Sequence, residues 1–312
     1  CGLRVGVFMA FPNMVNMQLM MFLLVGIGFF VRKKGIIGGT ARKELVNFCL
    51  YITLPFNIFH SFRMDWDSGM LTAFLEVLLL SIGYNVISIF ISFLFYHRSE
   101  SRRQKPLRYG TIVSNGGFLG NPVIEGIYGM EGLFYASVFM LPVRIVMWSI
   151  GTSCFLKGSR ENLVKKVLTH PCVAAIYLGL AAMISGIGFP VFLENTVSAI
   201  SSCNTPLSMM LIGMMLAEME PKGMLDGTMA FYTAARLLLI PAVIFGITRF
   251  LPVSPLLRGI TVIIAGMPAP VTTALLSAKY DGDEKYATAM IFVTTVLSLV
   301  TLPAWCYLLG AA

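Results

Sequence analysis

The sequence predicts an all-α membrane protein whose ten transmembrane helices form two inverted five-helix repeats, with helices four and nine broken. Hydrophobic residues make up 57% of the 312 positions and charged residues only 12%, against about 45–50% and 25% in soluble domains. The charged residues separate long apolar runs, and the chain resembles itself at an offset near half its length. Because the runs are apolar on every side, they do not fit the alternation of an outer-membrane barrel.

The apolar runs define ten predicted spans, each long enough for a helix across a bilayer. The first repeat, residues 14–156, holds spans at Met14–Val31, Leu45–Phe62, Leu71–Tyr96, Leu107–Tyr128 and Leu133–Leu156. A basic linker, residues 157–170, leads to the second repeat, residues 171–309. Its spans are Cys172–Ile187, Phe192–Met219, Leu225–Phe250, Leu256–Tyr280 and Tyr286–Leu309. The first run continues into a full span without a cleavage site, so we expect no removed signal peptide.

The positions of the basic residues orient the chain. Seventeen of the 23 Lys and Arg residues follow odd-numbered spans. Four lie on the opposite side: Arg4, Arg63, Arg249 and Arg258. By the positive-inside rule, this predicts a multi-pass protein of the cell membrane (plasma or inner membrane) with a cytoplasmic linker and both termini extracytoplasmic. The net charge of +8 then reflects topology, and no nucleic-acid partner is expected.

An internal repeat relates the two halves. Leu107, Arg108, Thr111 and Gly116 recur 150 residues later as Leu257, Arg258, Thr261 and Gly266. Leu54–Pro55 in the first half corresponds to Thr205–Pro206 in the second half at nearly the same offset. Since each half has five spans, the second must be inverted relative to the first. Inverted repeats are the architecture of secondary transporters, which bind their substrate near the midplane where the repeats meet.

Spans four and nine each contain a cluster of helix-breaking residues. Residues 114–122 hold three glycines, two asparagines and Pro122, and residues 266–270 hold Pro268 and Pro270. Proline removes a backbone donor and clashes with the preceding turn, and lipid offers no water to the freed carbonyls. We therefore predict that both helices break at mid-depth. Ordinary proline kinks, stabilised by neighbouring helices, are the alternative.

Such breaks predict an anion site. Asn121 and Pro122 are typical of the cap and first turn of a new half-helix, and Pro270 could open its counterpart. Helix N-termini present free N–H groups and the positive end of a dipole. The predicted substrate-binding residues are Ser114, Asn115, Gly116, Gly117, Asn121, Pro122, Arg144, Gly266, Met267, Pro268, Ala269, Pro270, Thr272 and Thr273. No catalytic residue or metal ligand is predicted.

Charged residues inside the spans are further candidates. Arg144, near the centre of span five, could grip a substrate carboxylate with its guanidinium fork, or pair with Glu76, Glu125 or a carbonyl of a broken helix. Arg236 is considered for the same binding role. Glu125, three residues after Pro122, could carry a coupled proton or lie at the outer interface.

Polar residues near Pro55 and Pro206 have two interpretations. Asn57, Asn204 and Ser208 could line one side of the pocket. Alternatively, they make interhelical hydrogen bonds.

Several stretches resemble the auxin efflux carrier (AEC) family. They are residues 115–122, 126–129, 266–273, 278–280 and Leu54–Pro55, and the resemblance covers essentially the whole chain. It implies the ten-helix fold of plant PIN carriers and bile-acid sodium symporters, in which spans four and nine cross. It also implies a scaffold of spans one, two, six and seven, a moving transport unit of the remainder, a homodimer and substrate contact at Asn115. The short central linker is similar to that of prokaryotic members.

The family resemblance implies a secondary carrier, not an enzyme. Bacterial members carry dicarboxylates and plant members auxin, so a small organic anion such as malate is expected, moved by an elevator-like motion. No cofactor is expected, although H⁺ or Na⁺ could be coupled. Sequence signatures of ATPases, zinc proteases and serine hydrolases are missing. The alternatives are a sodium-coupled symporter of the bile-acid type, which needs acidic and amide ligands beside the breaks, and a membrane receptor or sensor.

Overall fold

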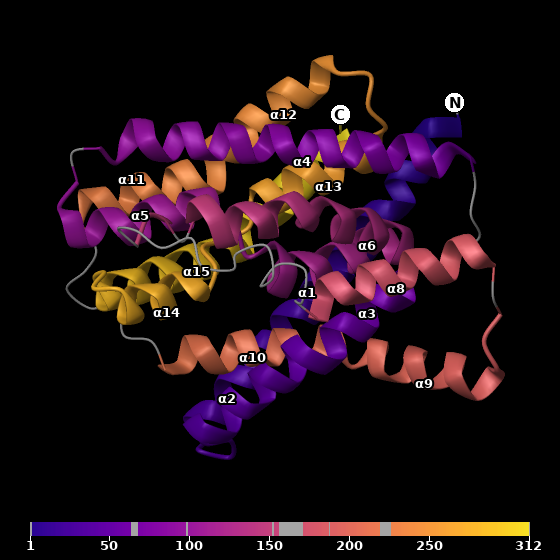
Figure 1. The fold of residues 1–312 in the computed structure, drawn as a ribbon, viewed down its shortest axis with the longest axis horizontal. Helices are drawn as coiled ribbons and strands as arrows, with labels where there is room; N and C mark the ends of the chain where they lie inside the picture. Colours follow the sequence, from indigo (N-terminus) through magenta and orange to yellow (C-terminus); the bar gives the residue numbers. More distant parts are fainter. Residues whose placement is uncertain are drawn as a thin grey trace. The chain divides into compact units, whose positions relative to one another are not determined.

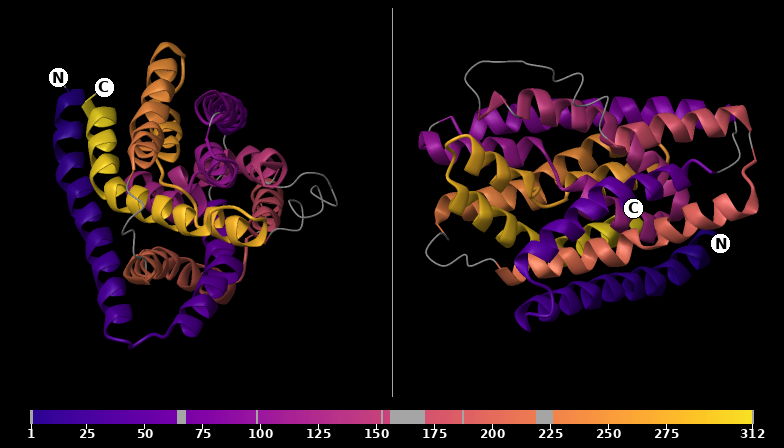
Figure 2. Two further views of the ribbon diagram at one scale, coloured as in Figure 1. Left: turned by 90° about the vertical axis from the view of Figure 1, so that its left-hand side faces the viewer. Right: turned by 60° about the horizontal axis from the view of Figure 1, so that its bottom comes forward.

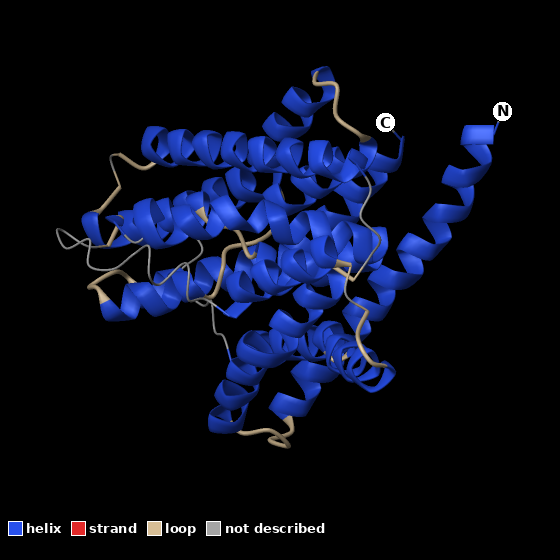
Figure 3. Ribbon diagram, turned by 45° about the vertical axis from the view of Figure 1, so that its right-hand side comes forward, coloured by secondary structure: helices blue, strands red, loops and turns tan. Residues whose placement is uncertain are grey.

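The computed structural model describes residues 2–63, 68–97, 99–151, 153–155, 171–186, 188–218 and 226–311. Within these ranges every regular element is a helix and there is no strand (Figure 3), which confirms the all-α prediction. The predicted linker, residues 157–170, lies outside the described residues. The crossing of a bilayer by ten spans stays a prediction.

The helices follow the predicted apolar runs (Figure 1). The first half contains α1 (Gly2–Lys33), α2 (Gly39–Phe48), η1 (Cys49–Thr53), α3 (Leu54–Ser61), α4 (Ser68–Phe95), α5 (Ser101–Ile112), η2 (Gly116–Gly120), α6 (Asn121–Val146) and η3 (Met147–Gly151). The second half contains α8 (Pro171–Ser185), α9 (Val191–Ser202), α10 (Asn204–Glu218), α11 (Gly227–Ala234), η4 (Ala235–Leu239), α12 (Ile240–Phe250), α13 (Pro255–Ala265), α14 (Thr272–Lys279) and α15 (Glu284–Ala311). The η elements are π-helical turns, which often occur at functional sites.

Five helical ranges are long and apolar enough to cross a membrane. They are Leu71–Phe95, Ser101–Val146, Val191–Glu218, Gly227–Phe250 and Glu284–Gly310. Two shorter apolar helices, α8 and α13, accompany them. These findings rest on length and composition.

Helix α6 is two helices joined at Gly129. The dihedral angles of Gly129 are φ 67° and ψ −158°, a region that is open almost only to glycine because other residues carry a Cβ. This position lies where the predicted spans four and five meet. Ser101–Val146 is therefore interrupted twice, at residues 113–115 and at Gly129.

The chain forms two compact units, which we describe separately. The first unit comprises Cys1–Phe74, Asn121–Val138 and Leu168–Glu218. The second unit comprises Leu75–Gly120, Phe139–Val167 and Met219–Ala312.

In the first unit, α1 packs along α10 (Figure 2). A glycine from each helix lies at their contact. A Cβ on Gly28 would collide with the backbone of Met210, and a Cβ on Gly213 would collide with the backbone of Val25 and Phe29. The missing side chains thus let the two backbones approach closely, the usual device at helix contacts in membranes.

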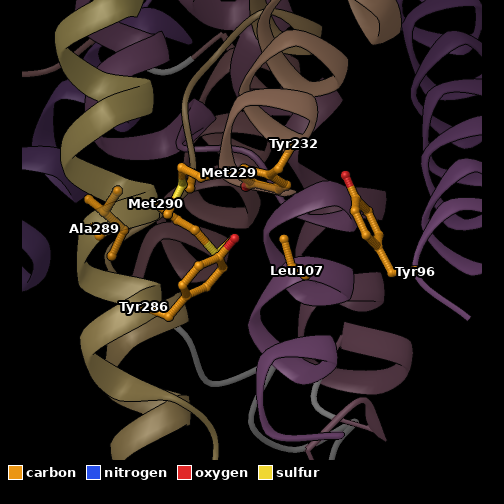
Figure 4. Packing of buried hydrophobic residues seen from close by; sticks show 9 residues of the cluster. Tyr96, Leu107, Met229, Tyr232, Tyr286, Ala289 and Met290 are labelled. Atoms are coloured by element: carbon orange, nitrogen blue, oxygen red, sulfur yellow. The ribbon is translucent and has the colours of Figure 1, made fainter. Parts of the chain in front are cut away.

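In the second unit, a buried cluster joins four helices (Figure 4). It comprises Tyr96, Leu107, Met229, Tyr232, Ala269, Tyr286, Ala289, Met290 and Ile291. Ala269 belongs to the non-helical segment between α13 and α14, while the other residues come from the end of α4 and from α5, α11 and α15. The core of this unit therefore holds that segment in place.

Replacing Gly213 by alanine is expected to destabilise the protein. Gly→Ala in a helix normally stabilises by up to about 1 kcal/mol, but overpacking costs about 1–3 kcal/mol. The matched control is Gly26→Ala in α1, where a Cβ would meet nothing within 4 Å. Thermal midpoints in detergent should fall for Gly213→Ala and stay or rise for Gly26→Ala. Equal midpoints for the two variants would contradict the packing described here.

Candidate functional site

Two non-helical segments interrupt the helices of the second unit. Helix α5 ends at Ile112, and Val113 is extended with φ −106° and ψ 131°. Helix α13 ends at Ala265, and α14 begins only at Thr272. The second interruption has a direct cause, because Pro268 and Pro270 lack the N–H groups that a continuing helix needs.

The two segments touch each other. The backbone N–H of Asn115 donates to the carbonyl oxygen of Pro268 at 3.0 Å. The next residue, Gly116, is also closely packed, because a Cβ there would lie 2.8 Å from Sδ of Met140 and 3.2 Å from Cγ2 of Ile264. All of these residues belong to the second unit.

Arg236 binds both interrupted helices. Its side chain is fully buried. Nε donates to the carbonyl of Met267 at 2.9 Å, and Nη1 donates to the carbonyl of Thr111 at 3.0 Å. In a continuous helix, the Thr111 carbonyl would accept from the N–H of Asn115, which instead donates to Pro268. The guanidinium thus replaces a helical donor that the interruption removes.

Further hydrogen bonds hold the segment between α13 and α14. The N–H of Ala269 donates to Oγ1 of Thr294 at 3.1 Å, and the hydroxyls of Tyr109 and Thr272 lie 2.8 Å apart. Tyr109 and Thr294 were not among the predicted site residues, because no sequence signal distinguishes them from other polar residues in apolar helices.

Some buried polar atoms beside this contact have no protein partner among the described residues. They are Oγ of Ser114 and Oγ1 of Thr273. In the first unit, both side-chain polar atoms of Asn121 likewise have no partner among the described residues. Ser114 and Thr273 are 3% and 0% exposed. A buried hydroxyl without a hydrogen bond costs about 1–3 kcal/mol, and such groups in native proteins usually serve a ligand or an ordered water. Ser114 precedes Asn115, and Thr273 lies in the first turn of α14.

Most of the predicted site residues belong to the second unit. Ser114, Asn115, Gly116, Gly117, Arg144, Gly266, Met267, Pro268, Ala269, Pro270, Thr272 and Thr273 lie there. Arg144 is buried beside Gly117, where a Cβ would lie 3.6 Å from its Nη2 atom. Asn121, Pro122 and Glu125 follow directly in the chain, as the start of α6, and belong to the first unit.

Glu125 is part of a polar network in the first unit. Its Oε2 atom accepts from Nδ2 of Asn57 at 3.2 Å and from Oγ1 of Thr205 at 3.0 Å. Asn57 also donates to Oγ of Ser201, at 3.2 Å, and accepts from Nδ2 of Asn204 at 3.3 Å. The partners of Glu125 in these bonds are neutral and come from two other helices.

The same network extends to the remaining polar residues near the prolines. Oγ1 of Thr53 donates to Oδ1 of Asn204 at 3.2 Å, and Ser208 lies 3.2 Å from Sγ of Cys49. The interhelical bonds expected of Asn57, Asn204 and Ser208 are thus present. Sequence reasoning missed Thr205 as a partner of Glu125, although Thr205 marks the repeat beside Pro206.

Comparison with known proteins identifies the family. A family model described as "Membrane transport protein" matches residues 14–166 and 155–306. An uncharacterized transporter of Methanocaldococcus jannaschii is 27% identical over 308 residues, 95% of this chain and 98% of that protein. One of Methanothermobacter thermautotrophicus is 28% identical over 304 residues, 95% and 99% of the two chains. A Rhizobium meliloti protein named "Putative malonate transporter" is 19% identical over 317 residues, 95% and 96%.

The fold and these matches define a helical membrane transporter. The chain belongs to the membrane transport protein (Mem_trans) family, the AEC family. The predicted family and the short prokaryotic type are confirmed. The family and its relatives are transporters, so the chain is not an enzyme.

Two buried threonines should respond differently to the same substitution. Thr273→Val removes a hydroxyl that has no protein partner, so it should not lower the free energy of unfolding in the absence of ligand. Thr294→Val removes the acceptor of the Ala269 N–H and should cost about 1–3 kcal/mol. Chemical denaturation in detergent measures both. If Thr273→Val is as costly as Thr294→Val, the Thr273 hydroxyl has a protein partner in the folded state.

Proposed function

We propose that the protein is a secondary carrier of small organic anions, which bind where the segments at residues 113–115 and 266–271 meet. The observation that carries this proposal is the contact of two buried non-helical segments, with the unpartnered hydroxyls of Ser114 and Thr273 beside it. Irregular backbone is tolerated at membrane depth where it lines a cavity or is buried in protein. Unpartnered buried hydroxyls then indicate groups that a ligand would use.

An anion suits this site for three reasons. Helix α14 begins at Thr272, and the positive end of its dipole favours a negative charge, although the N–H groups of Thr273 and Ala274 already donate to the carbonyls of Pro270 and Val271. Two buried arginines, Arg144 and Arg236, lie in the same unit. The name of the Rhizobium meliloti relative points to malonate, so mono- and dicarboxylates such as malonate and malate are the proposed substrates. Asn115, Asn121 and the remaining predicted residues complete the binding site.

The proposed architecture has ten spans in two inverted repeats, in which the interrupted helices four and nine cross. Ion pairs support the alternating topology, because each joins segments that the prediction puts on one side of the membrane. Arg32 and Arg42 bind Glu218, Arg103 binds Asp226 and Asp283, Arg102 binds Asp281, and Arg63 binds Glu194. Both termini are then extracytoplasmic, in a protein of the plasma or inner membrane that forms homodimers.

Transport follows an elevator-like movement of spans three to five and eight to ten against a scaffold of spans one, two, six and seven. The first compact unit holds spans one, two, six and seven, and the second holds spans three (from Leu75), eight, nine and ten. The division differs from the proposed one at Asn121–Val138, parts of spans four and five, which belong to the first unit. The substrate is driven by its own gradient, by the membrane potential or by a coupled ion.

Glu125 is the proposed site of coupling. Its described partners, Asn57 and Thr205, are neutral, so the carboxyl can exchange a proton without losing an ion pair. A sodium-coupled carrier is the second candidate. The carboxylate of Glu125 and the hydroxyl oxygen of Thr205 lie 3.0 Å apart, and hard cations prefer such oxygen ligands.

Counterflow in proteoliposomes tests the carrier. Uptake of labelled malonate should be faster into vesicles preloaded with unlabelled malonate than into empty vesicles. Asn115→Ala and Pro270→Ala should reduce this exchange at least about tenfold, because each changes an interrupted segment, whereas the exposed Asn195→Ala should match the parent. Binding without exchange would indicate a receptor. Full exchange by both site variants would refute the site.

If Glu125 couples transport to an ion, its substitution should affect gradient-driven accumulation of malonate but not malonate exchange. Glu125→Gln keeps the hydrogen-bonding shape but cannot release a proton or supply a charge. We expect it to retain malonate exchange and to lose accumulation driven by an imposed H⁺ or Na⁺ gradient. Applying each gradient separately identifies the ion. Accumulation at the parental level in both gradients would contradict a coupling role for Glu125.

A further inference from the structure

Arg236 carries a buried positive charge, although the interrupted helices need only hydrogen-bond donors for their free carbonyls. Its guanidinium donates to three different segments: the Met267 carbonyl, the Thr111 carbonyl and, at 3.2 Å, the hydroxyl of Tyr84 in α4. All three acceptors are neutral. Within the described ranges, no carboxylate forms an ion pair with it.

A neutral side-chain donor could bond the carbonyls of Met267 and Thr111 at a much lower free-energy cost than a charged one. A charged side chain inside a membrane costs at least about 2.5–3.5 kcal/mol on insertion scales, and neutral amides and hydroxyls make interhelical bonds without that cost. The arginine therefore adds something beyond hydrogen bonds. It adds a positive charge on a guanidinium group that is hydrogen-bonded directly to a carbonyl of each interrupted segment.

We propose that Arg236 is a positioning residue that keeps the two interrupted helices in register and supplies the positive charge by which the site selects anions. This inference rests on the proposed function. Arg236 bonds to the backbone of Met267 and Thr111, which leaves the hydroxyls of Ser114 and Thr273 to the ligand. Its charge acts across a dry interior, where electrostatic interactions are stronger than in water.

The position of Arg236 in the chain fits this role. It lies in the π-helical turn η4, and the indole N–H of Trp305 donates to the carbonyl of Leu237, in the same turn, at 2.9 Å. The backbone that carries the guanidinium is thus fixed by its own partner. A fixed charge costs little reorganisation when a ligand binds, so it favours anions more than a mobile side chain would.

Two substitutions separate charge from geometry. Arg236→Gln removes the charge, and Arg236→Lys keeps the charge but replaces the planar fork of donors by a compact ammonium group. The matched control is Arg258→Gln, because Arg258 donates to a single carbonyl, that of Thr248, at 3.2 Å. Binding of malonate and of its neutral isostere malonamide to the full-length protein in detergent is measured for each variant, together with thermal midpoints.

The parent protein and Arg258→Gln should prefer malonate over malonamide. Arg236→Gln should lower this preference at least tenfold, mainly by weakening malonate binding. Arg236→Lys should keep the preference within about threefold but weaken both ligands, because the segments lose their register. If Arg236→Gln does not purify folded, Arg236→His measured at pH 8 takes its place, because burial favours the neutral imidazole, and the same loss of preference is expected.

Other outcomes overturn the inference. A parental preference in Arg236→Gln, or in Arg236→His at pH 8, refutes the charge role. Parental affinities and midpoint in Arg236→Lys refute the positioning role. If the parent protein binds neither ligand, or binds both equally, the proposed anion carrier fails instead, and the two failures are thus distinguishable.

Discussion

In lipid, a backbone N–H or C=O group that leaves its helix finds no water, and each unpaired group costs several kcal/mol. The second unit satisfies this constraint by exchanging partners between two interrupted helices. The N–H of Asn115 donates to the Pro268 carbonyl and not to the Thr111 carbonyl, its acceptor in a continuous helix. Arg236 donates instead to the carbonyls of Thr111 and Met267. The Ala269 N–H binds Thr294 in α15. Side chains from neighbouring helices thus stabilise an irregular backbone inside an apolar bundle.

This exchange determines what remains for a ligand. Beside the backbone groups named above, which bind protein partners, the hydroxyls of Ser114 and Thr273 have no partner among the described residues. A Cβ on Gly116, next to Asn115, would meet the side chains of Met140 and Ile264. The proposed site therefore combines hydrogen-bonded backbone groups with polar side chains that a ligand could use, the arrangement expected of a preorganised binding site.

Composition and local chemistry predicted much of the fold. Apolar runs predicted the helices, and the prolines at 268 and 270 predicted the interruption after Ala265, because these features act within a few residues. The partners of Arg236, Glu125 and Ala269 could not be predicted. They lie 31 to 152 residues from Arg236, 68 and 80 from Glu125, and 25 from Ala269, and many buried hydroxyls and amides would suit them equally. The sequence predicted one span at Phe192–Met219, whereas α9 ends at Ser202 and α10 begins at Asn204. Pro206, in the first turn of α10, was the signal for this separation.

The central claim is that an organic anion binds where the segments at residues 113–115 and 266–271 meet. Anomalous scattering from a crystal grown with a brominated dicarboxylate would locate the anion directly. A bromine peak beside Ser114, Asn115 and Thr273 is the result that this account predicts. A single peak elsewhere, for example at the network of Glu125 and Asn57 or on the lipid-facing surface, would contradict it.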